Sequence, residues 1–165
     1  LKHVGATVIG TVSTPDKAAL ATDAGADHVL FYKSEDVAAR VRDITGGAGV
    51  RVTFDGIGMS TWETSLAATG RRGMIVSYGN AGGPVSDVNL GVLAQKGSLF
   101  VTRPTLFDYY ADPVERQAGA DYVFDMFRQG VISANIGQTS ALEDVAQAHR
   151  DLEAGKTVGA TVLRP

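Results

Sequence analysis

The stretch ATVIGTVSTPDK, residues 6–17, joins an apolar run to a turn and the start of a helix. Its first part is rich in small and β-branched residues and shows little alternation, which is typical of a strand buried on both faces of a parallel sheet. The run breaks at Gly10, and Pro15 suits the first turn of a helix because its missing N–H is not needed there. The stretch therefore predicts a strand, a turn and a helix that carries Lys17.

The polar side chains of this turn indicate what it could bind. In dinucleotide-binding folds an acidic side chain at the end of such a strand holds the ribose hydroxyls of NAD, whereas hydroxyl and cationic groups suit the extra phosphate of NADP. Here Ser13, Thr14 and Lys17 surround the turn, and the first carboxylate is that of Asp16. If the fold is of this kind, the turn favours NADP. The alternative is that the hydroxyls only cap a surface helix and that Lys17 is a solvated charge.

Composition narrows the class of protein. The 165 residues are 44% hydrophobic and 20% charged, as in an ordinary globular protein. The net charge of −3 and the absence of a basic cluster argue against a nucleic-acid partner. No cysteine is present, so these residues form neither a disulfide nor a thiolate zinc site, which is compatible with a cytoplasmic protein. No apolar run approaches the ~20 residues of a membrane helix.

Strand and helix patterns alternate along the first two thirds of the chain. Strands are expected over residues 4–12, 26–32, 50–54, 74–78 and 98–102, and helices over residues 15–24, 34–45, 60–68 and 90–95. We expect Ser34 to cap one helix and Ser60 with Glu63 to form a capping box for another. The alternation predicts an open parallel α/β sheet with ligands outside the carboxyl ends of its strands.

The composition changes after Arg103 and Pro104. Asp112 is expected to cap a helix over residues 113–129, followed by a strand at 132–139, a helix at 140–154 and a strand at 158–163. Ser140 with Glu143 resembles a second capping box. His149 falls on the apolar side of its helix, where we expect a packing role.

Few residues carry a recognisable catalytic pattern. Residues 56–58, Gly-Ile-Gly, resemble the start of a dinucleotide fingerprint, but Thr61 stands where its third glycine belongs, so we interpret them as a tight strand-to-helix turn on the ligand side of the sheet. The three histidines lack metal-ligand spacing, and no nucleophile elbow is present. Tyr32 is either a surface strand end or, with Lys17, part of a phosphate clamp.

Several runs together carry a family resemblance. They are GTVSTPDK (10–17), AGA (24–26), ITGG (44–47), FDGIG (54–58), RGMIVSYGN (72–80) and VTRP (101–104). With these runs in this order, almost the whole chain resembles the NADPH-dependent quinone reductases, the zinc-free, ζ-crystallin-like branch of the medium-chain dehydrogenase/reductases.

This resemblance implies a fold and a cofactor site. Residues 1–106 are expected to form part of an NADPH-binding domain, a Rossmann-like doubly wound parallel sheet that lacks its first strand. Residues 107–165 are expected to return to the GroES-like substrate domain. The cofactor contacts implied are Ser13, Thr14, Lys17 and Tyr32 at the 2′-phosphate end, Gly56 beside the adenosine, Tyr78, Gly79 and Asn80 from the pyrophosphate to the nicotinamide, and Lys156.

The resemblance also implies partners. The acceptor is expected to be a small quinone or enone, a homodimer is expected through the strand at residues 98–102, and no residue is assigned as a catalytic acid, a catalytic base or a metal ligand.

In such enzymes a substrate domain, a first strand and a glycine-rich loop come earlier, and none of them precedes Leu1. We therefore expect a C-terminal half that begins inside a larger protein, binds NADPH weakly alone and turns over no quinone. The alternatives are a zinc-dependent alcohol or enoyl reductase of the same superfamily and a non-catalytic, crystallin-type nucleotide-binding protein.

Overall fold

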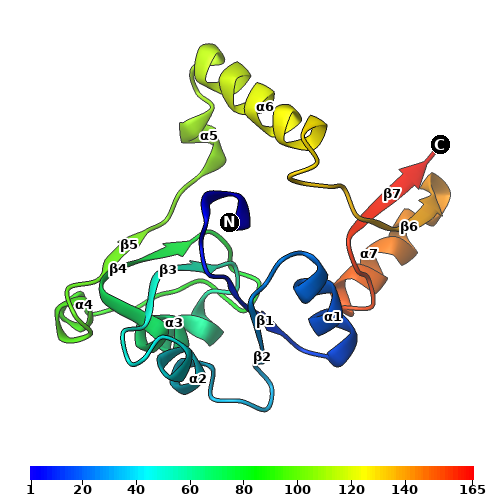
Figure 1. Cartoon of the computed structure of the whole chain (residues 1–165). Coiled ribbons are helices and arrows are strands. Elements are labelled where there is room, and N and C mark those ends of the chain that lie inside the picture. Colours follow the sequence, from blue (N-terminus) through cyan, green and yellow to red (C-terminus); the bar gives the residue numbers. More distant parts are fainter. The chain divides into compact units, whose positions relative to one another are not determined.

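The computed structural model describes all residues from Leu1 to Pro165. They form two compact units, Leu1–Ala111 and Asp112–Pro165. Figure 1 shows the helices and strands of both units.

Strands and helices alternate through the first unit (Figure 1). Its strands are β1 (Ile9–Val12), β2 (His28–Phe31), β3 (Val50–Asp55), β4 (Thr69–Ser77) and β5 (Phe100–Thr102). Its α-helices are α1 (Pro15–Asp23), α2 (Val37–Ile44), α3 (Trp62–Ala68), α4 (Gly91–Gln95) and α5 (Leu106–Tyr109), and 3-10 turns lie at Lys2–Val4 and Met59–Thr61. The expected alternating α/β order is confirmed.

All strand pairs of the first unit are parallel, as predicted. β1 pairs with β2, and β3, β4 and β5 form a second sheet in that order. β1 and β3 do not pair with each other, so the unit contains two sheets. In a Rossmann fold the first strand lies between the two halves of one continuous sheet. The break therefore agrees with a Rossmann-like sheet that lacks this strand.

Two apolar clusters hold the first unit together. One consists of Leu30, Val41 and Ala68, with Ile9 and Val50 packed against it, so it joins β1 and β2 to β3 through α2 and α3. The other lies between the second sheet and the helices that cover it, and its buried members are Trp62, Leu66, Ile75 and Leu99. Burial of this apolar surface is the main force that fixes the strand ends relative to one another.

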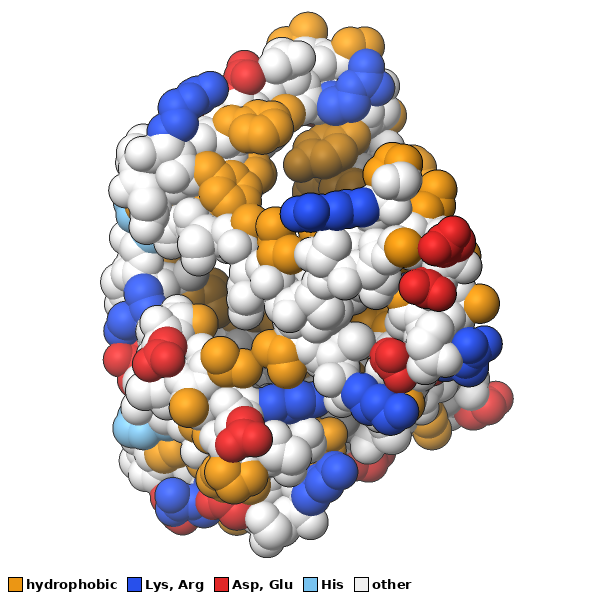
Figure 2. Space-filling view, turned by 90° about the vertical axis from the view of Figure 1, so that its right-hand side faces the viewer, with side chains coloured by type: hydrophobic (Ala, Val, Ile, Leu, Met, Phe, Trp, Pro, Cys, Tyr) orange, Lys and Arg blue, Asp and Glu red, His pale blue; other side chains and the backbone are white.

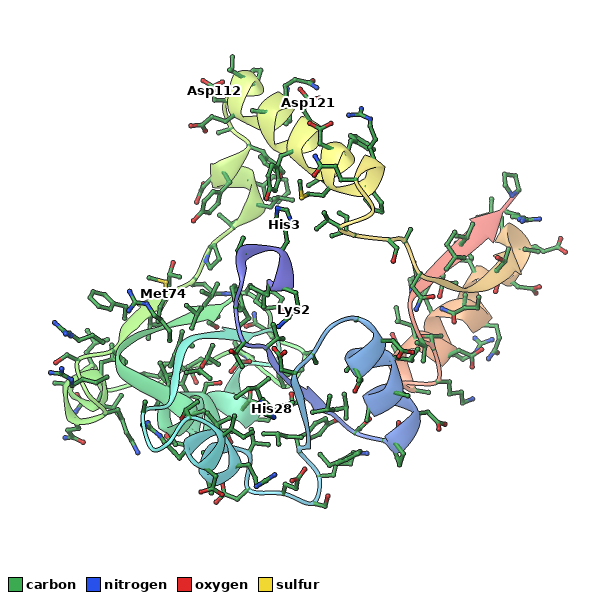
Figure 3. All side chains as sticks on the ribbon, viewed as in Figure 1. Lys2, His3, His28, Met74, Asp112 and Asp121 are labelled. Atoms are coloured by element: carbon green, nitrogen blue, oxygen red, sulfur yellow. The ribbon has the colours of Figure 1, made fainter.

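The second sheet has one face without helices. The register aligns Val52 with Met74 and Met74 with Phe100, so these side chains share a face with Phe54, two residues along β3. All four side chains are exposed. Figure 3 shows Met74 on the side of β4 away from α3.

Two helix caps agree with interpretations of the sequence, one being the alternative interpretation of the Thr14 hydroxyl and the other the cap expected at Asp112. Thr14 caps α1, because its Oγ1 accepts a hydrogen bond from the Lys17 amide at 3.4 Å, and Pro15 occupies the first helical position. Asp112 caps α6 (Pro113–Arg128), because its Oδ1 accepts a hydrogen bond from the amide of Val114 at 2.6 Å. The N-terminus of α1 and the N-terminus of α6 thus follow the expected chemistry, in which a side-chain acceptor is followed by proline.

Three other expected caps are wrong. Asp36, not Ser34, caps α2, and its Oδ1 accepts from the Ala39 amide at 3.0 Å. Ser60 belongs to a 3-10 turn before α3 and forms no cap, because that turn is organised by other groups described below. Ser140 lies inside the strand β6 (Ile136–Ala141) and forms no cap either.

Some strand limits also differ from expectation. β1 begins only at Ile9, because the chain before it forms a 3-10 turn that ends at Gly5 in the left-handed region. β4 begins at Thr69, five residues before the strand expected at 74–78, so Gly70 lies in a strand. A Cβ on Gly70 would stand 2.4 Å from the carbonyl oxygen of Ala48, so close backbone packing requires this glycine.

The second unit contains α6, β6, a 3-10 turn, α7 (Val145–Glu153) and β7 (Ala160–Arg164). β6 and β7 form a parallel pair. His149 is exposed on α7, so the packing role expected for it is wrong within this unit.

No helix of the chain is both long and apolar enough to cross a bilayer. Basic and acidic side chains are interspersed on the face drawn in Figure 2.

Candidate functional site

The first group of site residues gathers where β1 and β2 end. The register pairs Val12 with Phe31, and the amide of Tyr32 donates to the carbonyl oxygen of Val12 at 3.2 Å. Ser13 and Tyr32 therefore leave the sheet side by side. Thr14 then caps α1, which carries Lys17 in its first turn.

The charges at this strand end suit an anion. The Lys17 ammonium takes part in none of the ion pairs of the chain, and neither does the Asp16 carboxylate, which is exposed. The Tyr32 side chain is exposed, and its hydroxyl forms no hydrogen bond within the protein. The half-buried Glu35 carboxylate at the end of β2 accepts a hydrogen bond from the amide of Phe31. A free ammonium beside hydroxyl groups is a donor set that fits a phosphate monoester.

The second group is built on the carboxylate of Asp55, the last residue of β3. This residue is only 5% exposed. Its Oδ1 accepts hydrogen bonds from the amides of Ile57 at 2.9 Å and Gly58 at 3.0 Å. The Thr61 hydroxyl lies 2.9 Å from both carboxylate oxygens, and the Ser65 hydroxyl donates to Oδ2 at 2.6 Å. One side chain thus fixes the turn after β3 and the start of α3.

These contacts also decide the charge state of Asp55. Burial raises the pKa of a carboxyl group, but the hydrogen bonds from Ser65, Gly58, Ile57 and Thr61 outweigh burial and leave the pKa of Asp55 below its usual value. The group is therefore a buried carboxylate at neutral pH. Its charge is stabilised by oriented N–H and O–H dipoles, with no cation among the causes of the shift.

The turn of residues 56–58 packs directly on the loop that follows β4, residues 78–83. A Cβ on Gly56 would stand 3.0 Å from the ring of Tyr78, and one on Gly58 would stand 2.2 Å from the carbonyl oxygen of Gly83. The tight turn predicted here is confirmed, and the structure brings Gly56, Tyr78 and Gly79 together. Asn80 is also close, because its Cα would lie 3.4 Å from a Cβ on Gly58.

A pocket of about 330 Å³ opens beside this loop. It is lined mainly by apolar side chains from α3, α4, β5 and the loop before α4, and its polar members are Ser77, Asn80 and Arg103. The Arg103 guanidinium donates to the carbonyl oxygen of Ser77 at 2.7 Å, which ties the ends of β4 and β5 together. Neither Lys17 nor Tyr32 lines this pocket.

Lys156, the remaining predicted contact, lies in the second unit after α7. Its ammonium is 3.4 Å from Oδ1 of Asp151. The pKa of Asp151 is lowered, first by a hydrogen bond from Gln147 and then by Lys156. The role of Lys156 toward a cofactor stays a prediction.

Reasoning from the sequence missed Asp55 as an organising residue. The signal was present, because an aspartate that ends an apolar strand pattern before Gly-x-Gly is followed by hydroxyl residues at 61 and 65. Arg103 was also missed, since nothing in the sequence shows that its side chain returns to the end of β4.

Parallel strands with polar groups at their carboxyl ends, together with a glycine-lined turn, place the chain among the Rossmann-like α/β proteins. The family model described as zinc-binding dehydrogenase matches residues 1–107, and the chain belongs to this family.

Several known proteins are similar to almost the whole chain. The chain is 49% identical over 164 residues to a quinone oxidoreductase of Pseudomonas aeruginosa, covering 99% of this chain and 50% of the relative. Among solved structures it is similar to the quinone oxidoreductase of Pseudomonas syringae pv. tomato, with TM-score 0.95, 48% identity and coverage of 99% and 50%. The Escherichia coli quinone oxidoreductase complexed with NADPH gives TM-score 0.94, 44% identity and coverage of 99% and 51%. The chain thus spans about half the length of the relatives it matches.

The residues of this chain do not fit the zinc ion in the family's name. Cysteine is absent from the sequence, and no group of three or more His, Asp or Glu side chains is placed to hold a metal. A structural or catalytic zinc site needs three or four such ligands.

Proposed function

We propose that the intact protein containing this chain transfers a hydride from NADPH to a quinone or a similarly activated enone, and that this chain holds the cofactor. The observation that carries the proposal is the strand end formed by Ser13, Thr14, Lys17 and Tyr32, with hydroxyl groups, an unpaired ammonium and no buried carboxylate. An acidic group here would favour the free ribose hydroxyls of NAD. The donors present favour a ribose that carries a phosphate.

The residues of the chain have separate roles in this proposal. Lys17 and Tyr32 bind the 2′-phosphate, and Ser13 and Thr14 line that end of the cofactor. Gly56 borders the adenosine side of the cleft. The 78–80 backbone lies along the cofactor from the pyrophosphate to the nicotinamide.

NADPH, when bound, supplies the hydride and its two electrons. The chain itself binds and orients the cofactor, and no side chain of it is assigned as an acid or a base. Rate acceleration then comes chiefly from the fixed position of the nicotinamide against the acceptor and from the exclusion of water.

The isolated chain is proposed to be incomplete as a binding site. β1 and β3 both keep an unpaired edge, where a further parallel strand would complete one sheet. Neither the turn from β1 to α1 nor the turn from β2 to α2 contains a glycine, so neither is the glycine-rich loop before a helix N-terminus that usually holds a pyrophosphate. We therefore expect residues 1–165 alone to bind NADPH weakly and to turn over no quinone.

Two further assignments belong to the same proposal. β5 is the edge strand of its sheet, and Phe100 and Val101 on it are exposed, so we propose that residues 98–102 pair with a second copy to form a homodimer. Residues 107–165 are proposed to belong to the substrate domain, with Lys156 contributing to the cofactor site.

Steady-state kinetics of the intact protein with 1,4-benzoquinone test the function. Consumption of NADPH should be rapid and saturable, and NADH should be the poorer donor. A matched assay of residues 1–165 alone should show no quinone-dependent consumption. An intact protein that binds NADPH tightly but reduces neither a quinone nor an enone would contradict the proposed reaction and favour a non-catalytic nucleotide-binding protein.

A further inference from the structure

The carboxylate of Asp55 is fully used inside the protein. Two amides and two hydroxyl groups donate to its oxygens, and all four come from residues 57–65 of the same turn and helix. The group is 5% exposed, so it has neither a free lone-pair direction nor the access needed to touch a dinucleotide. Any effect of Asp55 on a ligand must therefore act through the backbone that it holds.

That backbone is bonded across to the loop after β4. The amide of Gly82 donates to the carbonyl oxygen of Ile57 at 2.6 Å, and the amide of Met59 donates to that of Gly83 at 2.9 Å. The amide of Tyr78 donates to the backbone oxygen of Asp55 itself at 2.9 Å. These bonds form a clasp, defined here as residues 55–59 bonded to residues 78–83.

Close packing leaves the clasp little freedom. A Cβ on Gly79 would stand 2.2 Å from the carbonyl oxygen of Gly56, and one on Gly82 would stand 2.2 Å from the hydroxyl of Ser60. The two segments are in backbone contact, so a displacement of the 56–58 turn must displace the 78–80 backbone.

We propose that Asp55 is a positioning residue, which sets the place of the 78–80 backbone through the clasp and thereby the affinity for the nicotinamide end of NADPH. The inference rests on the proposed function, because it takes the 78–80 backbone to lie along that cofactor. It adds a residue that touches neither the cofactor nor the acceptor.

The chemistry of a carboxylate explains why aspartate suits this position. Hydrogen bonds to an ionised oxygen are shorter and roughly twice as strong as those to a neutral one. Asparagine offers one oxygen acceptor and places an NH₂ donor where the Thr61 and Ser65 hydroxyls now donate. Asp55→Asn therefore keeps the shape of the side chain and weakens the clasp.

The test combines amide hydrogen exchange with steady-state kinetics in the intact protein. In Asp55→Asn, exchange at Met59 and Gly82 should accelerate by about tenfold, because a charge-assisted acceptor has become neutral. The KM for NADPH should rise by about tenfold and kcat should fall, because the nicotinamide is held less firmly against the acceptor, whereas the KM for benzoquinone should change less than about twofold. Thr61→Val, which removes a single donor, should shift the amide exchange, the KM for NADPH and kcat in the same directions by less.

Val41→Ala is the control, because it removes buried volume from the other apolar cluster and leaves the clasp intact. It should lower global stability without a selective effect at Met59 and Gly82. Equal acceleration at all amides in Asp55→Asn, or unchanged exchange at the clasp, overturns the inference. Faster exchange at the clasp with an unchanged KM for NADPH also overturns it and leaves the proposed function standing. A wild-type protein that does not use NADPH overturns the proposed function itself.

Discussion

Gly79 and Gly56 meet backbone to backbone: a Cβ on Gly79 would lie 2.2 Å from the carbonyl oxygen of Gly56 and 2.8 Å from its Cα. Side-chain atoms do not approach a backbone oxygen so closely, so neither segment can stay in place if Gly79 is enlarged. The contact joins the turn after β3 to the loop after β4. Its consequences can be measured by single substitutions.

Gly79→Ala should destabilise the protein by about 1 to 3 kcal/mol, because the added methyl group forces the two backbones apart. It should also displace Tyr78, whose ring lies over Gly56. Urea unfolding measures the first effect. Gly10→Ala is the matched control, since its Cβ would meet nothing closer than 3.7 Å. Equal stability of the two variants would contradict the packing described here.

Acid should remove a stabilising contribution of Asp55. Its pKa is lowered in the folded protein, where burial is outweighed by the hydrogen bonds from Ser65, Gly58, Ile57 and Thr61. A lowered pKa means that the contribution is complete above the ordinary value of 3.8 and is lost as pH falls through the folded value. The free energy of unfolding should therefore fall more steeply below about pH 4 in the wild type than in Asp55→Asn. Parallel pH profiles would show that the carboxylate is not held as described.

Among the cationic side chains of the first unit, Arg42 is expected to be the one whose substitution lowers the stability of the protein most. Its guanidinium donates to the carbonyl oxygens of Ala67 at 2.7 Å, Thr69 at 2.9 Å and Gly47 at 3.0 Å, which joins α2 to the end of α3. Arg42→Lys cannot reproduce this fork and should cost about 1 to 3 kcal/mol in unfolding free energy.

Arg40→Lys provides the comparison on the same helix. Arg40 forms exposed ion pairs with Glu35 and Asp43, and such pairs contribute at most about 1 kcal/mol. Chemical denaturation of both variants measures the unfolding free energy that each substitution removes. A larger loss in the Arg40 variant would contradict the assigned role of Arg42.

The order of strands and helices could be predicted because hydrophobic pattern, glycine and proline report on local structure. The β1 segment has a two-sided apolar run, and its helix begins at Pro15 after a threonine cap. The parallel pairing of β1 with β2 followed from the helix between them. The meeting of Ser13 and Tyr32 at this strand end could be predicted for the same reason, since parallel strands end at one edge, whereas their role toward a cofactor stays a prediction.

The rest depended on contacts between distant residues. Ser60 has the spacing of a capping box, but the amides of its turn already bond to Asp55 and to Gly83. These contacts with other segments, which the local spacing does not show, take the place of the cap. The sequence places hydroxyl residues at 61 and 65 after Asp55, but it does not show that their side chains converge on its carboxylate. The role of Asp55 appears only when four donors converge on it in the folded protein.

The most direct test of the account is the preference of the intact protein for NADPH over NADH in the wild type and in Lys17→Ala, measured as dissociation constants by titration. The account predicts that the variant loses about 1 to 3 kcal/mol of binding free energy for NADPH and almost none for NADH. Lys96→Ala, which removes an exposed ammonium just after α4, should leave the preference unchanged. An unchanged preference in Lys17→Ala would contradict the claim that this strand end binds the additional phosphate.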